Sequence, residues 1–168
     1  QRQENEYERD TYVTEITTLN SGDADFNPVI YQGDKLIFTS SRDMSTGENN
    51  DSWTGDKYYD LYVANIKDVT SFSAPELFKG PFNAAYNDGT LAFNKDYSEV
   101  YFTRCGSDDR KVDDYCGIYV SNYLPDGGWS EPVALPFFDD TMNIGTPCLS
   151  LDGNTLFFAA TNPDGYGG

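Results

Sequence analysis

An internal repeat constrains the fold of this chain more than any other feature of its sequence. Three short apolar and aromatic runs, Leu36–Ser40, Val100–Arg104 and Leu156–Ala160, each follow a turn containing Asp with Gly or Ser. They begin at residues 36, 100 and 156, so the spacing is 64 and then 56 residues. Leu61–Ala64 and Ile118–Ser121 follow the first two copies at a similar offset. A period of this length predicts repeated four-stranded sheets joined by long loops.

Strand signals dominate the chain and predict an all-β fold. Val, Ile, Thr, Tyr and Phe gather in short runs separated by Gly, Asn, Asp and Pro, and no segment keeps an apolar period of 3.6 residues. We predict a fragment of a β-propeller with about three four-stranded blades, part of a larger closed ring. The expected strands are Tyr12–Ile16, Phe26–Tyr31, Lys35–Ser40, Tyr59–Asn65, Pro75–Phe78, Thr90–Asn94, Glu99–Arg104, Gly117–Ser121, Pro132–Leu135, Pro147–Leu151 and Thr155–Ala160.

The repeats also suggest the domain organisation. Residues 1–11 are polar throughout, and we expect a linker or the end of a preceding domain there. The partial propeller then occupies residues 12–168, with repeats at about 12–65, 75–121 and 132–168. Because propellers usually need about 4–8 blades to remove their exposed sheet edges, we expect the protein to continue beyond Gly168 or a partner to cover the open edge.

The charge of the chain excludes two classes of partner. The formal net charge is −17 and only 11 residues are Lys or Arg, scattered along the sequence. Nucleic acid and anionic membrane surfaces carry the same sign of charge, so we expect neither as a direct partner. No apolar run approaches the ~18 residues of a membrane span, so we expect no direct membrane insertion.

The longest loops are expected at one face of the propeller. Strands alternate in direction, so the connections between second and third strands emerge on the same face as those between blades. The long connections on that face are Ser41–Tyr58, Lys79–Gly89, Cys105–Cys116 and Pro136–Thr146. Long loops gathered on one face of a repeat array usually mark the binding surface. The candidate interaction residues are Asp43, Asp51, Trp53, Asp109, Phe137, Phe138 and Asp139. The alternative is a solvated acidic rim that serves solubility.

The cysteines bear on the cellular compartment. Cys105 ends one expected strand and Cys116 opens the next, with ten residues between them, so a disulfide across adjacent antiparallel strands is geometrically reasonable. Such a bond favours a periplasmic or extracellular location, whereas two reduced thiols would fit a cytosolic protein. Cys148 lies within an expected strand and is interpreted as a buried small hydrophobe. The chain has no His and the Cys spacing is not that of paired ligands, so we expect no metal site.

The repeats carry a resemblance to a known family. Asp25–Tyr31 with Lys35–Arg42 resembles the opening repeat of the WD40-like (TolB-type) propellers of OmpA-family, PorE-like outer-membrane-associated proteins of Bacteroidetes. Tyr101–Cys105 followed by Cys116–Ser121 resembles their Cys-paired second repeat. Gly128–Pro132, Leu135–Phe137, Leu149–Ala159 and Gly165–Gly168 resemble the third. The chain departs from the family at Cys148 and Leu151, where Ala and Pro are common, and in its long loop after Ser40.

The resemblance implies a binding function and no catalysis. It implies a non-catalytic protein-interaction scaffold at the periplasmic side of the outer membrane, in the type IX secretion and gliding apparatus and its cell-wall anchoring. The partners would be envelope proteins, and peptidoglycan would be reached only through a domain outside this sequence. Asp140-Thr141-Met142 also resembles the O-glycosylation pattern of exported Bacteroidetes proteins, which makes Thr141 a candidate site for a sugar.

Two alternatives stay open at this point. Some propellers are carbohydrate-active enzymes or ligand-binding modules, and Asp23, Asp25, Asp139 and Asp140 could supply a carboxylate pair. Without His or a Ser-centred elbow there is no catalytic constellation to name, so we predict that the chain is not an enzyme and holds no cofactor. Calcium is the alternative, because Asp43–Asp51 offers oxygen ligands, although their spacing is not that of an EF-hand.

Overall fold

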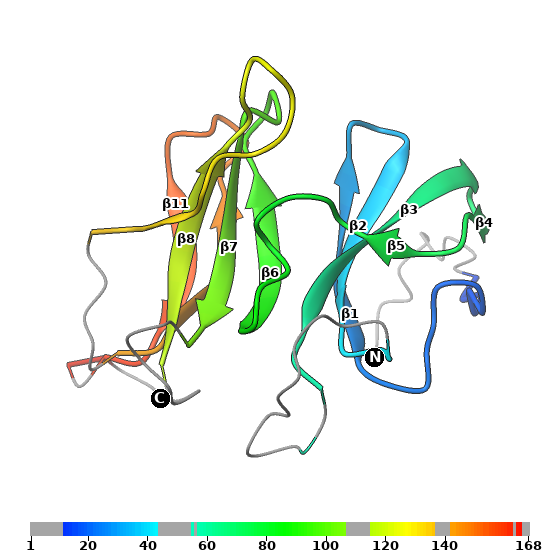
Figure 1. Cartoon of the computed structure of the whole chain (residues 1–168), viewed down its shortest axis with the longest axis horizontal. Helices are drawn as coiled ribbons and strands as arrows, with labels where there is room; N and C mark the ends of the chain where they lie inside the picture. Colours follow the sequence, from blue (N-terminus) through cyan, green and yellow to red (C-terminus); the bar gives the residue numbers. More distant parts are fainter. Residues whose placement is uncertain are drawn as a thin grey trace, which may run out of the picture.

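The computed structural model describes residues 12–43, 55, 57–106, 115–136, 142–162 and 164–165. Within these ranges the regular structure consists of antiparallel β-strands in three sheets (Figure 1). The first sheet contains β1 (Asp25–Tyr31), β2 (Lys35–Ser40), β3 (Asp60–Asp68), β4 (Ser71–Phe72) and β5 (Glu76–Leu77). The second contains β6 (Asn87–Phe93), β7 (Glu99–Cys105), β8 (Cys116–Asn122) and β9 (Val133–Ala134). The third contains β10 (Ile144–Leu149) and β11 (Leu156–Ala160). The predicted all-β fold is confirmed.

The first expected strand is wrong. Tyr12–Ile16 lies outside any strand, and the side chains of Tyr12 and Val13 are 85% and 95% exposed. A strand needs a neighbour to which its backbone can bond, and the described residues place no such neighbour beside this segment. The other expected strands overlap observed ones, while the short β3–β4 hairpin was not anticipated. The expected linker, residues 1–11, lies outside the described residues.

The first two sheets repeat the same strand order and register. Each is a meander whose third strand also pairs with a short fourth strand, through Tyr62 opposite Leu77 in the first sheet and Tyr119 opposite Ala134 in the second. Phe38 pairs with Tyr62 as Phe102 pairs with Tyr119. The third sheet contains two strands, and within the described residues the three sheets do not close into a ring (Figure 1).

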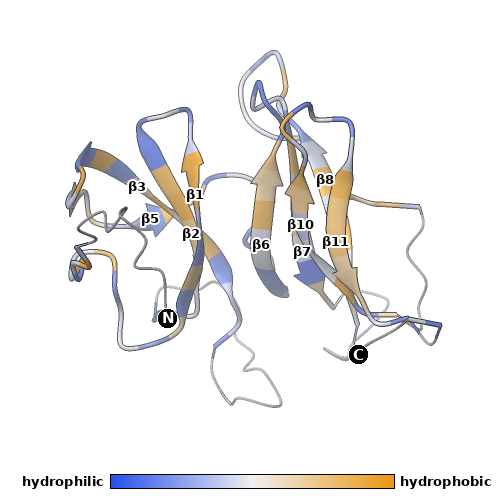
Figure 2. Cartoon of the chain, turned by 180° about the vertical axis from the view of Figure 1, so that it is seen from behind, coloured by the Kyte–Doolittle hydropathy of each residue, from blue (hydrophilic) through white to orange (hydrophobic). Residues whose placement is uncertain are grey.

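The main core lies between the first and second sheets. Its buried residues are Tyr31, Ile37, Leu61, Phe78, Phe82, Leu91, Val100 and Phe102. A smaller cluster covers the other side of the first sheet, where Leu19 packs with Phe38 and Tyr62. β10 packs against the second sheet, whereas β11 is apolar yet largely exposed, with Phe157 and Phe158 58% and 42% accessible (Figure 2). Phe157 and Phe158 lie on opposite faces of β11, so both faces of this strand are only partly covered within the described residues.

A repeated contact interlocks neighbouring sheets. The first strand of each sheet has a bulge at a residue with positive φ, which is Asn27 in β1, Thr90 in β6 and Thr146 in β10. The amide of Thr90 donates to Thr39 Oγ1 of the preceding sheet at 3.2 Å, and the amide of Thr146 donates to Thr103 Oγ1 at 2.9 Å. The same hydrogen bond therefore sets the spacing between the first and second sheets and between the second and third.

Glycines make this close approach possible. A Cβ on Gly89 would lie 3.3 Å from Thr39 Cγ2, and a Cβ on Gly145 would lie 3.0 Å from Thr103 Cγ2. Both distances are tighter than ordinary van der Waals contact, so a larger residue would push the sheets apart. The interlock therefore needs a small residue immediately before the bulge.

Candidate binding cavity

A cavity of about 540 Å³ opens at one end of the three sheets. This end holds the starts of β1, β3, β6, β8 and β10 and the ends of β2, β7 and β11, and it is the lower end in Figure 1. It is also the end at which the long connections were expected. The cavity is lined by Phe26, Tyr59, Asn87, Gly89, Thr90, Thr103, Cys105, Cys116, Asn143, Ile144, Gly145, Thr146, Ala159, Ala160 and Thr161. All three sheets contribute, so the cavity exists only through their stacking.

Two aromatic rings form one wall. Phe26, at the start of β1, meets Tyr59, just before β3, edge to face with ring centroids 5.2 Å apart. Phe26 is 39% exposed, so part of its ring faces solvent. Such a geometry fixes both rings while leaving apolar surface available to a ligand.

Two asparagines hold the polar wall in place. Asn87 Oδ1 accepts from the amide of Tyr59 at 2.9 Å, and Asn143 Oδ1 accepts from the amide of Cys116 at 2.8 Å. Each bond joins the start of a first strand to the start of the third strand in the preceding sheet. Thr161 Oγ1 accepts from the amide of Asn143 at 2.9 Å. These asparagines were not among the residues predicted from sequence, although they hold the same place in the repeat, Asn87 as the first residue of β6 and Asn143 immediately before β10.

The disulfide lies in the cavity wall. Cys105 and Cys116 face each other across β7 and β8 with their Cα atoms 3.9 Å apart, and their sulfur atoms are bonded. The predicted bridge is therefore present. The interpretation of Cys148 as a buried residue is wrong, because its side chain is free and exposed on β10. No described layer covers that side of the strand, so the alternation of β10 turns Cys148 outward.

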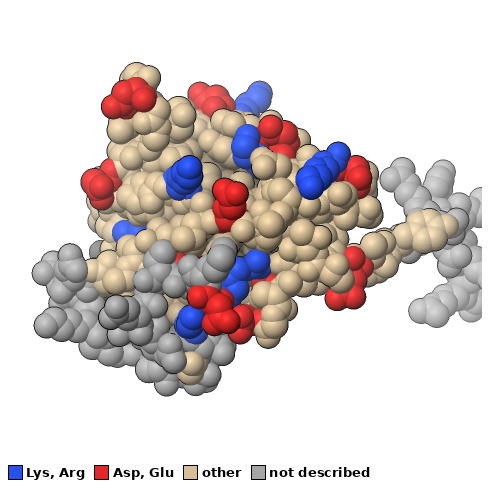
Figure 3. Space-filling model, turned by 45° about the vertical axis from the view of Figure 1, so that its right-hand side comes forward, with Lys and Arg blue, Asp and Glu red and all other residues tan. Residues whose placement is uncertain are grey.

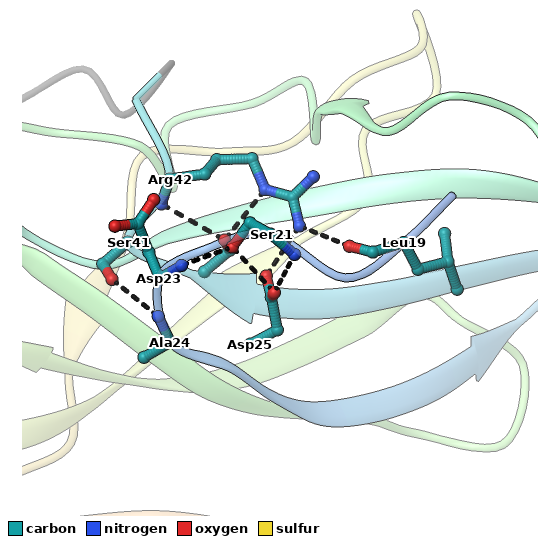
Figure 4. Close-up of polar contacts among 8 residues, drawn as sticks. Leu19, Ser21, Asp23, Ala24, Asp25, Ser41 and Arg42 are labelled. Carbon is teal, nitrogen blue, oxygen red and sulfur yellow. Dashed lines mark hydrogen bonds and ion pairs between the residues drawn. The ribbon is translucent and has the colours of Figure 1, made fainter. Parts of the chain in front are cut away.

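An ion pair secures the segment before β1 (Figure 4). Arg42 Nη2 donates to Asp25 Oδ1 at 2.6 Å and to the Leu19 carbonyl at 2.7 Å, and its Nε donates to Ser40 Oγ at 2.8 Å. The amide and hydroxyl of Ser21 donate to Asp25 Oδ2 at 2.6 and 2.8 Å. Burial raises the pKa of Asp25, but the hydrogen bonds outweigh it and hold the pKa below its ordinary value.

The second sheet repeats this arrangement in a more buried form. Arg104 donates from Nε to Asp88 Oδ1 at 2.6 Å and from Nη2 to Asp88 Oδ2 at 2.9 Å, and Nη2 also donates to the Pro81 carbonyl at 2.9 Å. The amide of Ala84 donates to Asp88 Oδ2 at 3.1 Å. Burial raises the pKa of Asp88 to about 6, and the hydrogen bonds from Arg104 only partly offset it. Each ion pair thus holds in place the segment that precedes the first strand of its sheet.

These pairs bear on the carboxylates considered for catalysis. Asp25 is bound to Arg42 and kept ionised, which suits a structural anchor and not a general acid. Asp23 is exposed beside it. In the third sheet, Ile144 occupies the place of Asp25 and Asp88 and pairs with Ala160, so this position holds no carboxylate to form such an ion pair.

The predicted interaction residues lie mostly outside the described residues. This applies to Asp51, Trp53, Asp109, Phe137, Phe138 and Asp139, and also to Asp140 and the glycosylation candidate Thr141. Asp43 is described, and its carboxylate, 97% exposed, pairs with Lys57 Nζ at 3.1 Å. It lies at the same end of the sheets as the cavity. Figure 3 shows Lys and Arg side chains interspersed with Asp and Glu over one face of the protein.

Neither a metal cluster nor a membrane-spanning helix occurs among the described residues. The calcium candidate Asp43–Asp51 falls largely outside the described residues. In the described part of the chain, no group of three or more His, Cys, Asp or Glu side chains is placed to hold a metal ion. None of the described residues belongs to a helix of the length and apolarity that a membrane crossing needs.

No protein-family model, curated protein or solved structure matches the chain. We therefore infer its function from the repeat, the disulfide, the cavity and the family resemblance of the repeat motifs.

Proposed function

We propose that this chain is a non-catalytic scaffold that binds envelope proteins at the periplasmic side of the outer membrane, and that its sheets are consecutive blades of a larger β-propeller. The observation that carries the proposal is the interlock between sheets, repeated from Thr39 to Thr90 and from Thr103 to Thr146. The same contact joins each sheet to the one before it. Sheets stacked one on the next by a repeated contact are what consecutive propeller blades require.

The outer face of the third sheet supports the same proposal. Ala159 occupies the place of Thr39 and Thr103, whose hydroxyls bond to the following sheet, and it is exposed. Phe157, two residues before it and therefore on the same face, is 58% exposed. A further sheet of the same repeat would cover this face and bury the Phe157 ring. We therefore assign the face to the next blade.

The disulfide supports an oxidising compartment. A bond between Cys105 and Cys116 persists in the periplasm or outside the cell and is rare in the cytosol. The resemblance of the repeats to OmpA-family, PorE-like proteins narrows this to the outer membrane and suggests the type IX secretion and gliding apparatus. Attachment to peptidoglycan would require a different domain.

The end of the sheets that carries the cavity is proposed as the docking face. Asp43 lies there, and the described ends of the connections Ser41–Tyr58 and Pro136–Thr146, whose sequences contain Trp53 and Phe137, lie at the same end. Aromatic anchors within a charged rim are typical of protein interfaces. The opposite end carries tight turns, including the β3–β4 turn with Val69, which is 92% exposed.

Photo-crosslinking in the native host tests this proposal. A photoreactive amino acid is placed at Asp43 or Tyr115, at the proposed docking face, and at Val69 as the control on the opposite end. We expect Asp43 and Tyr115 to yield crosslinks to envelope proteins of one complex, and Val69 to yield none. Equal crosslinking from both ends, or none from Asp43 and Tyr115, would refute the docking face.

A ligand-binding module is the second candidate, and the cavity is the observation that favours it. We do not propose an enzyme, because Asp25 is engaged by Arg42 and by Ser21, which suits a structural anchor.

A further inference from the structure

We infer that Tyr12–Ile16 is an unpaired outermost strand, which completes a further sheet of the same polypeptide by pairing with the third strand of that sheet. This pairing rests on the proposed larger propeller, and it joins the first sheet to the sheet before it in the ring. Within the described residues the segment belongs to no strand, and the side chains of Tyr12 and Val13 are 85% and 95% exposed.

This segment holds the place of a fourth strand in the repeat. Asp25 in β1 and Asp88 in β6 occupy the same register position. The two residues of β5, Glu76–Leu77, lie 12 and 11 residues before Asp88. The same offsets counted back from Asp25 reach Val13 and Thr14. The two residues of β9 lie 11 and 10 residues before the matching position of β10, so the fourth strand has nearly the same offset in each repeat.

The connection after the segment follows the path seen before β6. The amide of Ser21 donates to Asp25 Oδ2 at 2.6 Å. The amide of Ala84 donates to Asp88 Oδ2 at 3.1 Å, over the same separation of four residues. Because these two bonds match, Val13–Thr14 precedes its sheet as β5 precedes the second sheet.

Each observed fourth strand pairs with the sheet that comes before it in the chain, β5 with β3 and β9 with β8. The amide of Phe78, immediately after β5, donates to the Leu61 carbonyl of β3 at 2.8 Å. The amide of Leu135, immediately after β9, donates to the Ile118 carbonyl of β8 at 3.0 Å. Glu15 holds the place of Phe78, so its amide is the expected donor to the third strand of the partner sheet.

The described sheets do not supply this partner. β3 and β8 already bind β5 and β9 along the edge that a fourth strand uses. The third sheet contains only β10 and β11 within the described residues, so it offers no third strand there. A second copy of the chain would present the same occupied edges. The partner is therefore the third strand of another sheet of the same repeat in the larger propeller.

Apolar surface remains open beside the segment. A hollow of about 290 Å³ lies between the segment and the first sheet, and Ile16, Leu36 and Phe38 are among the residues that line it. On the second sheet, Val100 and Phe102 hold the places of Leu36 and Phe38. Both are fully buried in the core between the first and second sheets. A sheet placed before the first would bury Leu36 in the same way.

The first sheet lacks the glycine of the interlock. Gly89 and Gly145 precede the bulges of β6 and β10 and allow a Thr of the preceding sheet to approach. Phe26 holds their place in β1. Its side chain takes up the space that this approach needs, so the interlock is not repeated between the first sheet and a sheet before it. Pairing of Tyr12–Ile16 provides a different join at this boundary.

Photo-crosslinking of the full-length protein in its native host tests the pairing. A photoreactive amino acid replaces Val13, and the crosslinked peptides are identified by mass spectrometry. We expect crosslinks within one polypeptide, to a strand outside this sequence that holds the place of Leu61–Ala64 and Ile118–Ser121 in its own repeat. Crosslinks to another protein or to a second copy, or no crosslink at all, would overturn the inference.

Two substitutions at one position test the backbone hydrogen bond. Glu15→Pro removes the amide that donates to the partner strand, whereas Glu15→Ala keeps it. In the full-length protein we expect Glu15→Pro to lower the yield of the Val13 crosslink by about tenfold and Glu15→Ala to leave it unchanged. Glu15 is exposed in this chain, so both variants of the 168-residue chain should melt at the temperature of the parent. Equal crosslink yields for the two variants would contradict the strand pairing.

A second probe at Phe157 separates the strand pairing from the proposed propeller. Phe157 is exposed on the face assigned to the next blade, so a crosslink from it within the polypeptide supports the larger propeller. If Phe157 gives such a crosslink and Val13 does not, only the strand pairing is refuted. If neither position crosslinks within the polypeptide, the proposed propeller is refuted as well. The docking face is tested independently by the probes at Asp43 and Tyr115.

Discussion

Replacing the same repeated phenylalanine in two sheets should have very different effects on stability. Phe102 in β7 and Phe158 in β11 hold matching places in the repeat, but Phe102 is fully buried and Phe158 is 42% exposed. Phe102 packs edge to face on Phe82 with centroids 5.4 Å apart and contacts Tyr119 at 6.1 Å. We expect Phe102→Ala to be strongly destabilising and Phe158→Ala to be mild.

The magnitudes follow from burial. Truncating Phe102 removes the transfer free energy of a fully buried ring and leaves an enclosed cavity, which together cost about 3–5 kcal/mol. It also removes the ring beneath the Arg104 guanidinium, whose carbon lies 5.2 Å from the centroid. For Phe158 roughly half of the transfer term applies and the space left is open to solvent, so the cost is about 1 kcal/mol.

Urea denaturation of the 168-residue chain measures both changes. Trp129 packs against Phe82 and Phe93 in the core, so its fluorescence reports on the unfolding of that region. The free energies of unfolding of the two variants are compared with that of the parent chain under the same conditions. Equal losses for Phe102→Ala and Phe158→Ala would show that the described difference in burial, and with it the stacking of the sheets, is wrong.

Three further predictions concern the disulfide, a buried carboxylate and a modification. Mass spectrometry of unreduced protein from its native envelope should show a Cys105–Cys116 peptide, and its loss should cost about 2–3 kcal/mol; two separately alkylated thiols would contradict this. Burial raises the pKa of Asp88 to about 6, above the ordinary Asp value of about 3.9, so protonated Asp88 contributes its full stabilisation below about pH 3.9 and loses it as the pH rises through about 6. The free energy of unfolding, measured in urea between about pH 4 and 7, should depend less on pH in Asp88→Asn than in the parent chain. An unchanged pH dependence would refute this prediction. Thr141 should carry a sugar in the native host, and an intact mass without one would dismiss the motif.

Much of the strand pattern could be predicted from local sequence. Runs of β-branched and aromatic residues between turn residues located β2 at Lys35–Ser40 with its observed bounds, and located β7 to within a residue. The failure at Tyr12–Ile16 has a physical cause, because an apolar and β-branched run forms a strand only where another strand is available to pair with it. Composition alone does not contain that information.

The candidate site was only partly accessible from sequence. Alternation of strand direction correctly placed the ends of β2, β7 and β11 at one end of the sheets, where the cavity opens. The lining residues were not predicted, because Phe26, Asn87 and Asn143 have no distinctive local pattern. Their roles appear only when strands from different sheets meet.

The all-β class, the repeat and the Cys105–Cys116 bond could be predicted from the sequence, because each depends on residues close together in the chain or on periodic patterning. The interlocks, the exposure of Cys148 and the lining of the cavity depend on how the sheets pack and are visible only in the structure. Thr39 bonds to a residue 51 positions away, and Thr103 to one 43 positions away. Contacts at such separations depend on how whole sheets stack. A Thr in a strand fits many local sequence patterns, so its sequence neighbours do not reveal which distant residue it contacts.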